Sequence, residues 1–207
     1  MFLIKPHKSC LITYLGIVFG IFSMCFSIKN IGSMDLKYFQ YSLIFLMLSG
    51  ICDMFDGKFA RSCKRTEEQK QLGIQLDSLA DTFCFLAVPV VLMISLGLNS
   101  IIDIIIYSIF CICGVTRLSY FNVVCANDTN LKSYKGLPVT TTAIIYPVVG
   151  LLLNILSLDI LKIIYLELTF ITSILFVLKI DVLKFRGRAY IIVPILALIL
   201  LVLLLVI

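Results

Sequence analysis

Seven long apolar runs decide what this chain can fold into. Each is near the length of about 20 residues that an α-helix needs to cross the roughly 30 Å hydrocarbon core of a bilayer. Lys162 and Glu167 weaken the sixth run, so we expect six or seven helices. Only 14% of the residues are charged and the mean hydropathy is +1.11, which excludes an ordinary water-soluble domain. The runs cover residues 11–28, 38–60, 73–97, 100–125, 138–157, 161–180 and 189–207.

These spanning segments must be helical. In lipid every backbone polar group needs an internal partner, and the runs lack the alternating pattern of a membrane barrel. We therefore predict an all-α, polytopic transmembrane helix bundle that forms a single domain over residues 1–207. Gly16 and Gly20 form a GxxxG motif in the first run, which more often indicates close packing within a bundle than a dimer interface.

Basic residues are distributed unevenly between the ends of the runs. With the N-terminus in the cytoplasm, 14 of the 17 Lys and Arg residues fall on the cytoplasmic side, and Lys29, Lys37 and Lys162 remain outside. This is the positive-inside asymmetry of integral membrane proteins, and it fits a bacterial inner membrane best. The net charge of +5 therefore reports orientation and attraction to anionic lipid headgroups, and we expect no nucleic-acid partner.

Four of the 12 acidic residues lie within 29 positions, where the second helix ends and the third begins. Asp53 and Asp56 are three residues apart and Asp77 and Asp81 are four apart, so each pair shares one helix face. A hairpin of the two helices would oppose the pairs near the cytoplasmic surface. Acidic residues are costly in a membrane and mark functional sites there. Hard divalent cations, Mg²⁺ or Mn²⁺ and two in number, would relieve the repulsion.

Small residues and one arginine accompany the carboxylates. The pattern resembles the signature of the CDP-alcohol phosphotransferase family, and all eight of its positions are present. The gap between its halves is longer than the commonest spacing in the family. We assign the polar insert 66–69 to a loop, where insertions are tolerated. The pattern reads Asp53-x-x-Asp56-Gly57-x-x-Ala60-Arg61, then eleven residues, then Gly73-x-x-x-Asp77-x-x-x-Asp81.

The resemblance implies roles for these residues. The four aspartates would bind two metal ions that hold the diphosphate of a CDP-linked lipid, and Asp81 would also be the general base that deprotonates the acceptor alcohol. Charge neutralisation and in-line positioning are the main requirements of such a transfer. Thr13 lies in a stretch that resembles the family's Asn-x-x-Thr region, although the Asn is not matched. The implied CDP-lipid-binding residues are Thr13, Gly57, Ala60, Arg61 and Gly73.

Three further stretches resemble the phosphatidylserine synthase branch of the family: 77–89, 114–123 and 136–138. This branch implies transfer of the phosphatidyl group of CDP-diacylglycerol to the hydroxyl of L-serine with release of CMP, and the family implies a homodimer. Arg117 and Asn122 are the candidate acceptor-binding residues. A structural role for Arg117, with its stem in the lipid and its head at the border, is nearly as good an interpretation.

Two alternatives stay open. The same chemistry could use glycerol 3-phosphate or an inositol phosphate, although their phosphate groups call for more basic side chains than Arg117 alone, with Tyr120 where the branch has a second Arg. A cation channel or transporter belongs to another class of protein. It would need polar residues at several depths of the membrane, whereas the four acids gather on one side.

Overall fold

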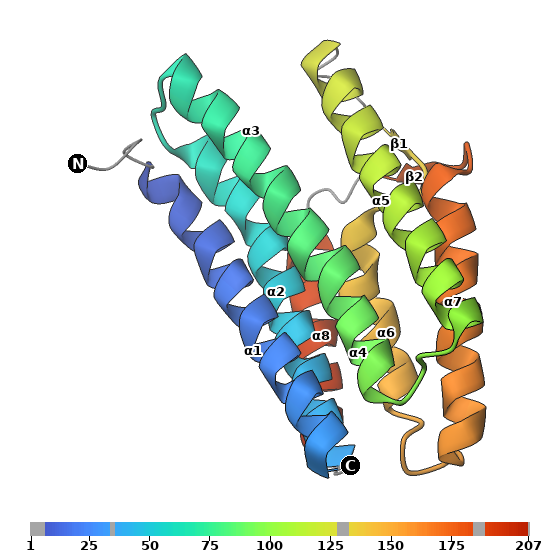
Figure 1. The fold of residues 1–207 in the computed structure, drawn as a ribbon. Helices are drawn as coiled ribbons and strands as arrows, with labels where there is room; N and C mark the ends of the chain where they lie inside the picture. The colour runs from blue at the N-terminus through green and yellow to red at the C-terminus, as the bar shows by residue number, and fades with distance from the viewer. Residues whose placement is uncertain (1–6, 34–35, 128–132, 184–188, 207) are drawn as a thin grey trace.

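The computed structural model describes residues 7–33, 36–127, 133–183 and 189–206. Over this part of the chain, the helices pack side by side in an antiparallel bundle (Figure 1). The all-α fold predicted from the sequence is confirmed. The helices are α1 Leu11–Ser33, α2 Leu36–Ser62, α3 Glu67–Thr82, α4 Val88–Ser95, α5 Ile101–Asn127, α6 Thr142–Gly150, α7 Leu158–Val177 and α8 Ala189–Val206.

Short helical turns extend several of these helices. A 3₁₀ turn, Lys8–Cys10, precedes α1, and another, Val139–Thr141, precedes α6. A π-helical turn, Phe83–Ala87, joins α3 and α4 into one rod. Within the described ranges the bundle therefore has seven rods, the larger of the two expected numbers. Among the residues that the structure describes, four stretches are long and apolar enough to cross a membrane: Lys8–Ser33, Glu67–Ser95, Ile101–Val124 and Leu158–Val177.

From its length we expected the fifth apolar run to form one spanning helix. The structure shows that it does not. The helix α6 ends at Gly150, and the next residues form turns in which Leu151, Leu152 and Leu153 each donate a backbone hydrogen bond three residues back. A Cβ on Gly150 would collide with Leu43 of α2, so this end of α6 is fixed by close contact between the helices.

Hydroxyl groups and glycines pack α1 against α2 and against the turn between α3 and α4. Ser42 on α2 exchanges hydrogen bonds with Ser23 on α1, at 2.7 Å to the Ser42 carbonyl and 2.9 Å to the Ser23 carbonyl. In lipid no hydrophobic effect drives helices together. Close packing of small residues and hydrogen bonds between polar side chains take over that role. A Cβ on Gly16 would lie 3.3 Å from Cys52 Cβ, and one on Gly20 would lie 3.0 Å from Cys84 Sγ. The GxxxG motif therefore packs within the bundle, as expected.

The π turn ties the α3–α4 rod to the start of α6. Val88 donates its backbone N–H to Phe83, five residues back, and Pro89 has no N–H to give. The Phe85 carbonyl, four residues before Pro89, instead accepts a hydrogen bond from Thr142 Oγ1 at 3.2 Å. A side chain 57 residues away thus satisfies the carbonyl that the proline leaves without a helical partner.

A two-stranded ribbon lies at the end of the bundle where α2 passes into α3 (Figure 1). The strands β1, Ser133–Lys135, and β2, Asp181–Leu183, pair antiparallel, and Lys135 forms an ion pair with Asp181 at 2.7 Å. Gly136 has a φ of +76°, and a Cβ there would collide with the Phe176 carbonyl. The ribbon fastens the α5–α6 connection to the end of α7, and the sequence analysis did not predict it.

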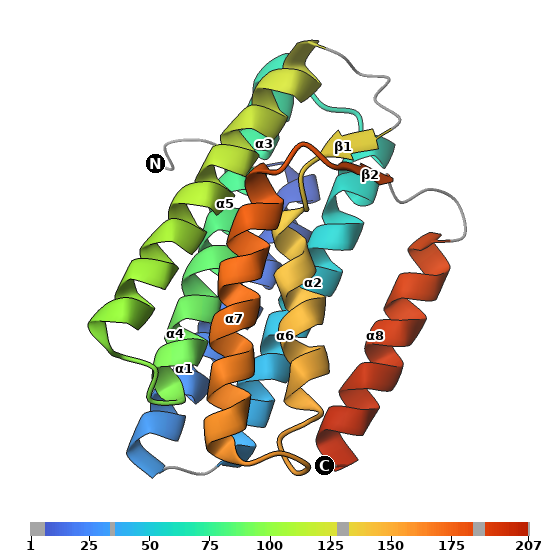
Figure 2. The same cartoon turned by 90° about the vertical axis from the view of Figure 1, so that its right-hand side faces the viewer.

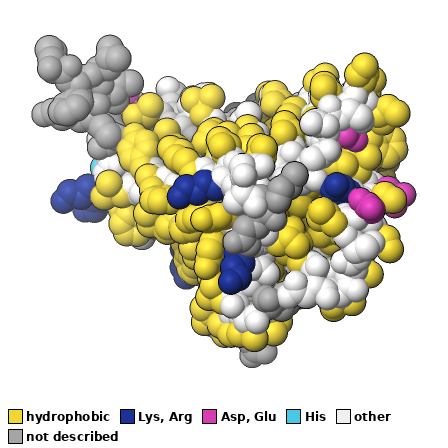
Figure 3. Space-filling model, turned by 60° about the horizontal axis from the view of Figure 1, so that its bottom comes forward, with side chains coloured by type: hydrophobic (Ala, Val, Ile, Leu, Met, Phe, Trp, Pro, Cys, Tyr) yellow, Lys and Arg dark blue, Asp and Glu magenta, His cyan; other side chains and the backbone are white. Residues whose placement is uncertain are grey.

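The helix α8 stands at the edge of the bundle, beside α2 and α6 (Figure 2). Figure 3 turns the opposite end of the molecule forward, the end with the α4–α5 and α6–α7 connections. Hydrophobic side chains cover most of that face, with isolated basic and acidic groups between them. Such a surface suits contact with lipid tails and headgroups.

Candidate active site

The α2–α3 hairpin gathers the carboxylates. Asp53 and Asp56 from α2 and Asp77 from α3 each offer an oxygen, and these oxygens all lie within 4.8 Å of one another. Asp81 lies one turn beyond Asp77 on α3 and lines a small cavity together with the other three carboxylates. The structure thus brings three of the candidate metal ligands into one cluster, with the fourth against its edge.

A capping box sets the residue at which α3 begins. It thereby helps to determine which face of the helix carries Asp77 and Asp81. Thr66 Oγ1 accepts from the Gln69 backbone N–H at 3.3 Å, and Gln69 Oε1 accepts from the Thr66 backbone N–H at 3.1 Å. Each bond satisfies a donor that the helix end would otherwise leave unpaired. The assignment of residues 66–69 to a loop was therefore wrong, because the insert forms the cap and first turn of α3.

The geometry of the three-carboxylate cluster fits a hard divalent cation. Magnesium–oxygen bonds are about 2.0–2.1 Å long, so oxygens on opposite sides of an octahedral ion are roughly 4.2 Å apart. The oxygens of Asp53, Asp56 and Asp77 lie within 4.8 Å of one another, which needs only small side-chain movements to close on an ion. Carboxylates so close together repel one another strongly where water is scarce, and a cation between them removes that cost.

Thr13 orients one of the three carboxylates. It lies in the first turn of α1, and its Oγ1 donates a hydrogen bond to Asp56 Oδ2 at 2.8 Å. Asp56 is 6% exposed, so this bond meets the need of a buried oxygen for a partner. The bond leaves the other oxygen of Asp56 available to a ligand.

A cavity of about 190 Å³ opens on the α1 side of the carboxylates. All five candidate CDP-lipid-binding residues line it, together with Asp56 and Asp77. A Cβ on Gly73 would lie 3.1 Å from Arg65 Nη1, and one on Gly57 would lie 3.4 Å from Arg61 Nη1. The glycines therefore make room for two guanidinium groups beside the carboxylates. The candidate residues in the lining are Thr13, Gly57, Ala60, Arg61 and Gly73.

Arg65 is a residue that the sequence reasoning did not place in the site. It lies after the end of α2, between the two halves of the family signature, so the spacing of the signature did not include it. In the structure it lines the same cavity as Gly73. Its Nε is buried and has no hydrogen-bond partner in the described part of the chain. Buried guanidinium groups are normally paired, so this donor is suited to an anionic ligand in the cavity.

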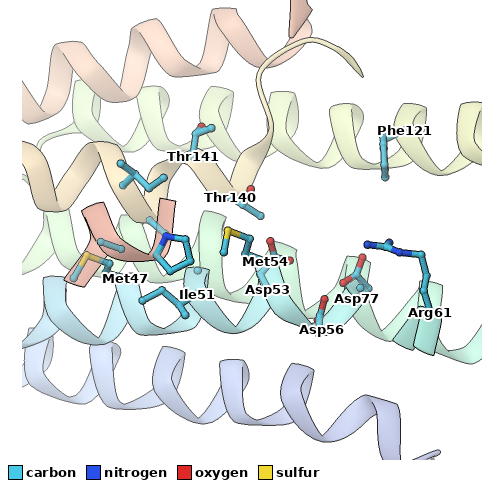
Figure 4. A pocket seen from close by; sticks show the side chains of 16 residues that line it. Met47, Ile51, Asp53, Met54, Asp56, Arg61, Asp77, Phe121, Thr140 and Thr141 are labelled. Atoms are coloured by element: carbon cyan, nitrogen blue, oxygen red, sulfur yellow. The ribbon is translucent and has the colours of Figure 1, made fainter. Parts of the chain in front are cut away.

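A second cavity, of about 310 Å³, lies on the other side of the carboxylates (Figure 4). Asp56, Asp77 and Arg61 lie at one end of it, and Met47 and Ile51 at the other. The cavity thus changes from charged to apolar along α2. Its remaining lining residues are Gly50, Asp53, Met54, Gly57, Phe121, Thr140, Thr141, Ala143, Ile144, Pro194 and Ala197.

The two candidate acceptor-binding residues lie outside both cavities. Asn122 Nδ2 donates to Ser78 Oγ at 2.7 Å, which joins α5 to α3. Arg117 is 7% exposed, and its Cζ lies 5.0 Å from the centre of the Phe121 ring. Arg117 lines a third cavity, of about 440 Å³, with Lys135 and Lys179. Of the α5 residues, the structure brings Phe121 to the larger carboxylate cavity instead.

Comparisons with known proteins agree with the site. The family model for CDP-alcohol phosphatidyltransferase matches residues 7–180. The chain is 32% identical over 142 residues to a CDP-diacylglycerol–serine O-phosphatidyltransferase of Saccharomyces cerevisiae, covering 66% of this chain and 50% of that protein. It is 31% identical over 118 residues to the protein of the same name from Bacillus subtilis, covering 56% of this chain and 59% of that one.

An archaeal relative carries a related name. Over 102 residues the chain is 31% identical to an archaetidylserine synthase of Methanothermobacter thermautotrophicus, covering 49% of this chain and 42% of that protein. The chain thus spans about half the length of the curated relatives it matches. The family match, in contrast, extends over most of the chain and includes every carboxylate of the site. The chain belongs to the CDP-alcohol phosphatidyltransferase family.

Proposed function

We propose that this chain is a CDP-diacylglycerol–serine O-phosphatidyltransferase of phospholipid biosynthesis. It would move the phosphatidyl group of CDP-diacylglycerol to the hydroxyl of L-serine and release CMP. The observation that carries the proposal is the cluster of Asp53, Asp56 and Asp77, whose oxygens lie within 4.8 Å of one another between a small cavity with two arginines and a larger, mostly apolar one. The names of the relatives support serine as the acceptor.

In the proposed reaction the serine hydroxyl oxygen attacks the phosphorus that carries diacylglycerol, and the bond from that phosphorus to the oxygen of CMP breaks. Asp81, 8% exposed and beside Asp53, accepts the hydroxyl proton. Arg61 and Arg65 hold phosphate oxygens in the smaller cavity. Asp53, Asp56 and Asp77 would hold Mg²⁺ or Mn²⁺, two ions with the help of Asp81, and the ions would neutralise the diphosphate and the charge that develops on it.

We further propose how the chain sits in the cell. Residues 1–207 would form one integral membrane domain, with the N-terminus and the active site facing the cytoplasm of a bacterial inner membrane and two copies forming a homodimer. The 14 to 3 distribution of basic residues supports this orientation. The α2–α3 connection and the ribbon lie at the end of the bundle that the orientation places in the cytoplasm (Figure 1).

Measuring CMP release from CDP-diacylglycerol with one alcohol at a time tests the acceptor. We expect release that depends on L-serine, requires Mg²⁺ or Mn²⁺ and yields phosphatidylserine. Glycerol 3-phosphate and inositol phosphate serve as the competing acceptors in the same assay. Release that one of them stimulates and serine does not would replace serine as the acceptor and leave the transferase assignment intact.

Removing Arg65 is expected to weaken binding of the CDP-linked lipid. A hydrogen bond to a charged group contributes about 1.5–3 kcal/mol, so Arg65→Ala should raise the KM for CDP-diacylglycerol at least about tenfold, with a smaller change in kcat. Lys64→Ala is the matched control, because Lys64 is the exposed neighbour and lines neither carboxylate cavity. If both substitutions raise the KM equally, Arg65 acts only through the overall positive charge near the α2–α3 connection and not through a direct hydrogen bond to the lipid.

A further inference from the structure

The helix α8 forms part of the wall of the candidate site, although it lies beyond the residues that the family model matches. That match ends at residue 180, and α8 is Ala189–Val206. Pro194 and Ala197 nevertheless line the larger carboxylate cavity. One side of this cavity is therefore formed by a C-terminal segment that lies outside the family match.

One stripe of α8 packs against the bundle. Ala197 is 7% exposed, Leu200 8% and Leu204 1%, at the three- and four-residue spacing of one helix face. Leu204 approaches Gly150 of α6, where a Cβ would lie 3.5 Å from Leu204 Cδ2. Leu198, on another face of the helix, is 60% exposed. Within this stripe, Ala197 is the small residue next to the cavity, and leucines follow it.

The lining of the cavity matches a lipid bound by its headgroup, because one end of the cavity is charged and the other is apolar. From Asp53 to Met47 along α2 the lining changes from carboxylate to hydrocarbon over six residues, about 9 Å of helix axis. This direction leads from the α2–α3 end of the bundle toward its middle (Figure 1). Ile144, which lines the apolar part, is 40% exposed, so this side of the cavity meets the membrane-facing surface.

We propose that the apolar part of this cavity holds an acyl chain of the lipid substrate, and that Ala197 of α8 sets its width. The inference rests on the proposed function, in which the substrate is a CDP-linked diacyl lipid. A headgroup at the carboxylates places the ester-linked chains next to Met54, Ile51 and Met47, and Ala197 leaves the opposite side of the cavity open. The chain therefore fits only where the lining leaves enough room, and a bulkier side chain at this position would narrow the space.

The test compares two substrates in detergent micelles, CDP-dioleoylglycerol and CDP-dioctanoylglycerol, with CMP release as the readout. We expect Ala197→Phe to lower the ratio of kcat/KM for the long-chain over the short-chain lipid at least about tenfold, because the added ring takes up space that only the long chain needs. Ala197→Leu should give a smaller change in the same direction, and it serves if the phenylalanine variant does not elute as a folded protein on size exclusion.

Leu198→Phe is the matched control, since it adds an aromatic ring to the same helix on an exposed position. It should leave the ratio at the wild-type value. An unchanged ratio in both Ala197 variants, or the same change in Leu198→Phe, would overturn the acyl-chain assignment. Wild-type protein that releases no CMP from either lipid with any of the alcohols would instead refute the proposed function, so the two failures are separate results.

Discussion

Replacing Asp81 with asparagine is expected to lower serine-dependent CMP release by about 10²- to 10⁴-fold, the contribution of a positioned general base. Asparagine has nearly the size of aspartate but cannot take up the hydroxyl proton. Asp81 is 8% exposed and lies beside Asp53, outside the three carboxylates within 4.8 Å of one another. The loss should therefore appear in kcat, with little change in the KM for CDP-diacylglycerol.

A buried aspartate elsewhere provides the control for this substitution. Asp103, 6% exposed, accepts a hydrogen bond from the Ser100 backbone N–H at 2.8 Å and completes the capping box in which Ser100 caps α5. Asparagine can accept the same bond, so Asp103→Asn should keep wild-type kcat and nearly wild-type stability. Initial rates of CMP formation with purified variants decide the matter. Wild-type kcat in Asp81→Asn would place the general base on another residue.

The approach of the carboxylates could be predicted because it depends on local periodicity. Spacings of three and four residues place each aspartate pair on one helix face, and a short connection places two neighbouring helices side by side. The capping box at Thr66 was equally readable, since Thr-x-x-Gln is a recognised start of a helix. Assigning these residues to a loop gave too much weight to the family spacing and too little to the local chemistry.

Other features depend on contacts between distant residues. The carbonyl of Phe85 that Pro89 leaves unpaired is satisfied by Thr142, and no local pattern indicates which side chain will reach it. The partner of Asn122 is also distant in sequence, because Ser78 lies 44 residues earlier. Membrane helices are apolar on most faces, so hydrophobic periodicity gives little information about which neighbour a polar side chain meets.

The lining of the apolar cavity was hidden for the same reason. The run 189–207 contains only apolar or small residues, so nothing in its composition marks a face that lines a site. The structure instead buries one stripe and brings Ala197 to the cavity that holds the carboxylates. Small size, not polarity, distinguishes this position, and a single sequence gives no measure of which small residue is needed.

Chelating divalent cations with EDTA is expected to abolish CMP release, and added Mg²⁺ or Mn²⁺ should restore it. Three carboxylates within 4.8 Å of one another cannot hold an anionic diphosphate beside them without a cation. Asp77 is the α3 member of the cluster, so Asp77→Ala removes the ligand that faces the α2 pair. Loss of a direct ligand should weaken metal affinity by more than the roughly 10- to 100-fold that loss of an outer-shell partner costs.

Electron paramagnetic resonance of Mn²⁺ measures this binding without any substrate turnover. Wild-type protein should bind Mn²⁺ and Asp77→Ala should not at the same concentration. Asp159→Ala, whose side chain is 91% exposed, should bind like the wild type. Asp81→Asn should keep most of the binding, because the cluster of Asp53, Asp56 and Asp77 remains complete. If Asp77→Ala bound Mn²⁺ as well as the wild type, Asp77 would not be a metal ligand. A loss of activity in both variants would then indicate that Asp77 and Asp81 share the role of general base.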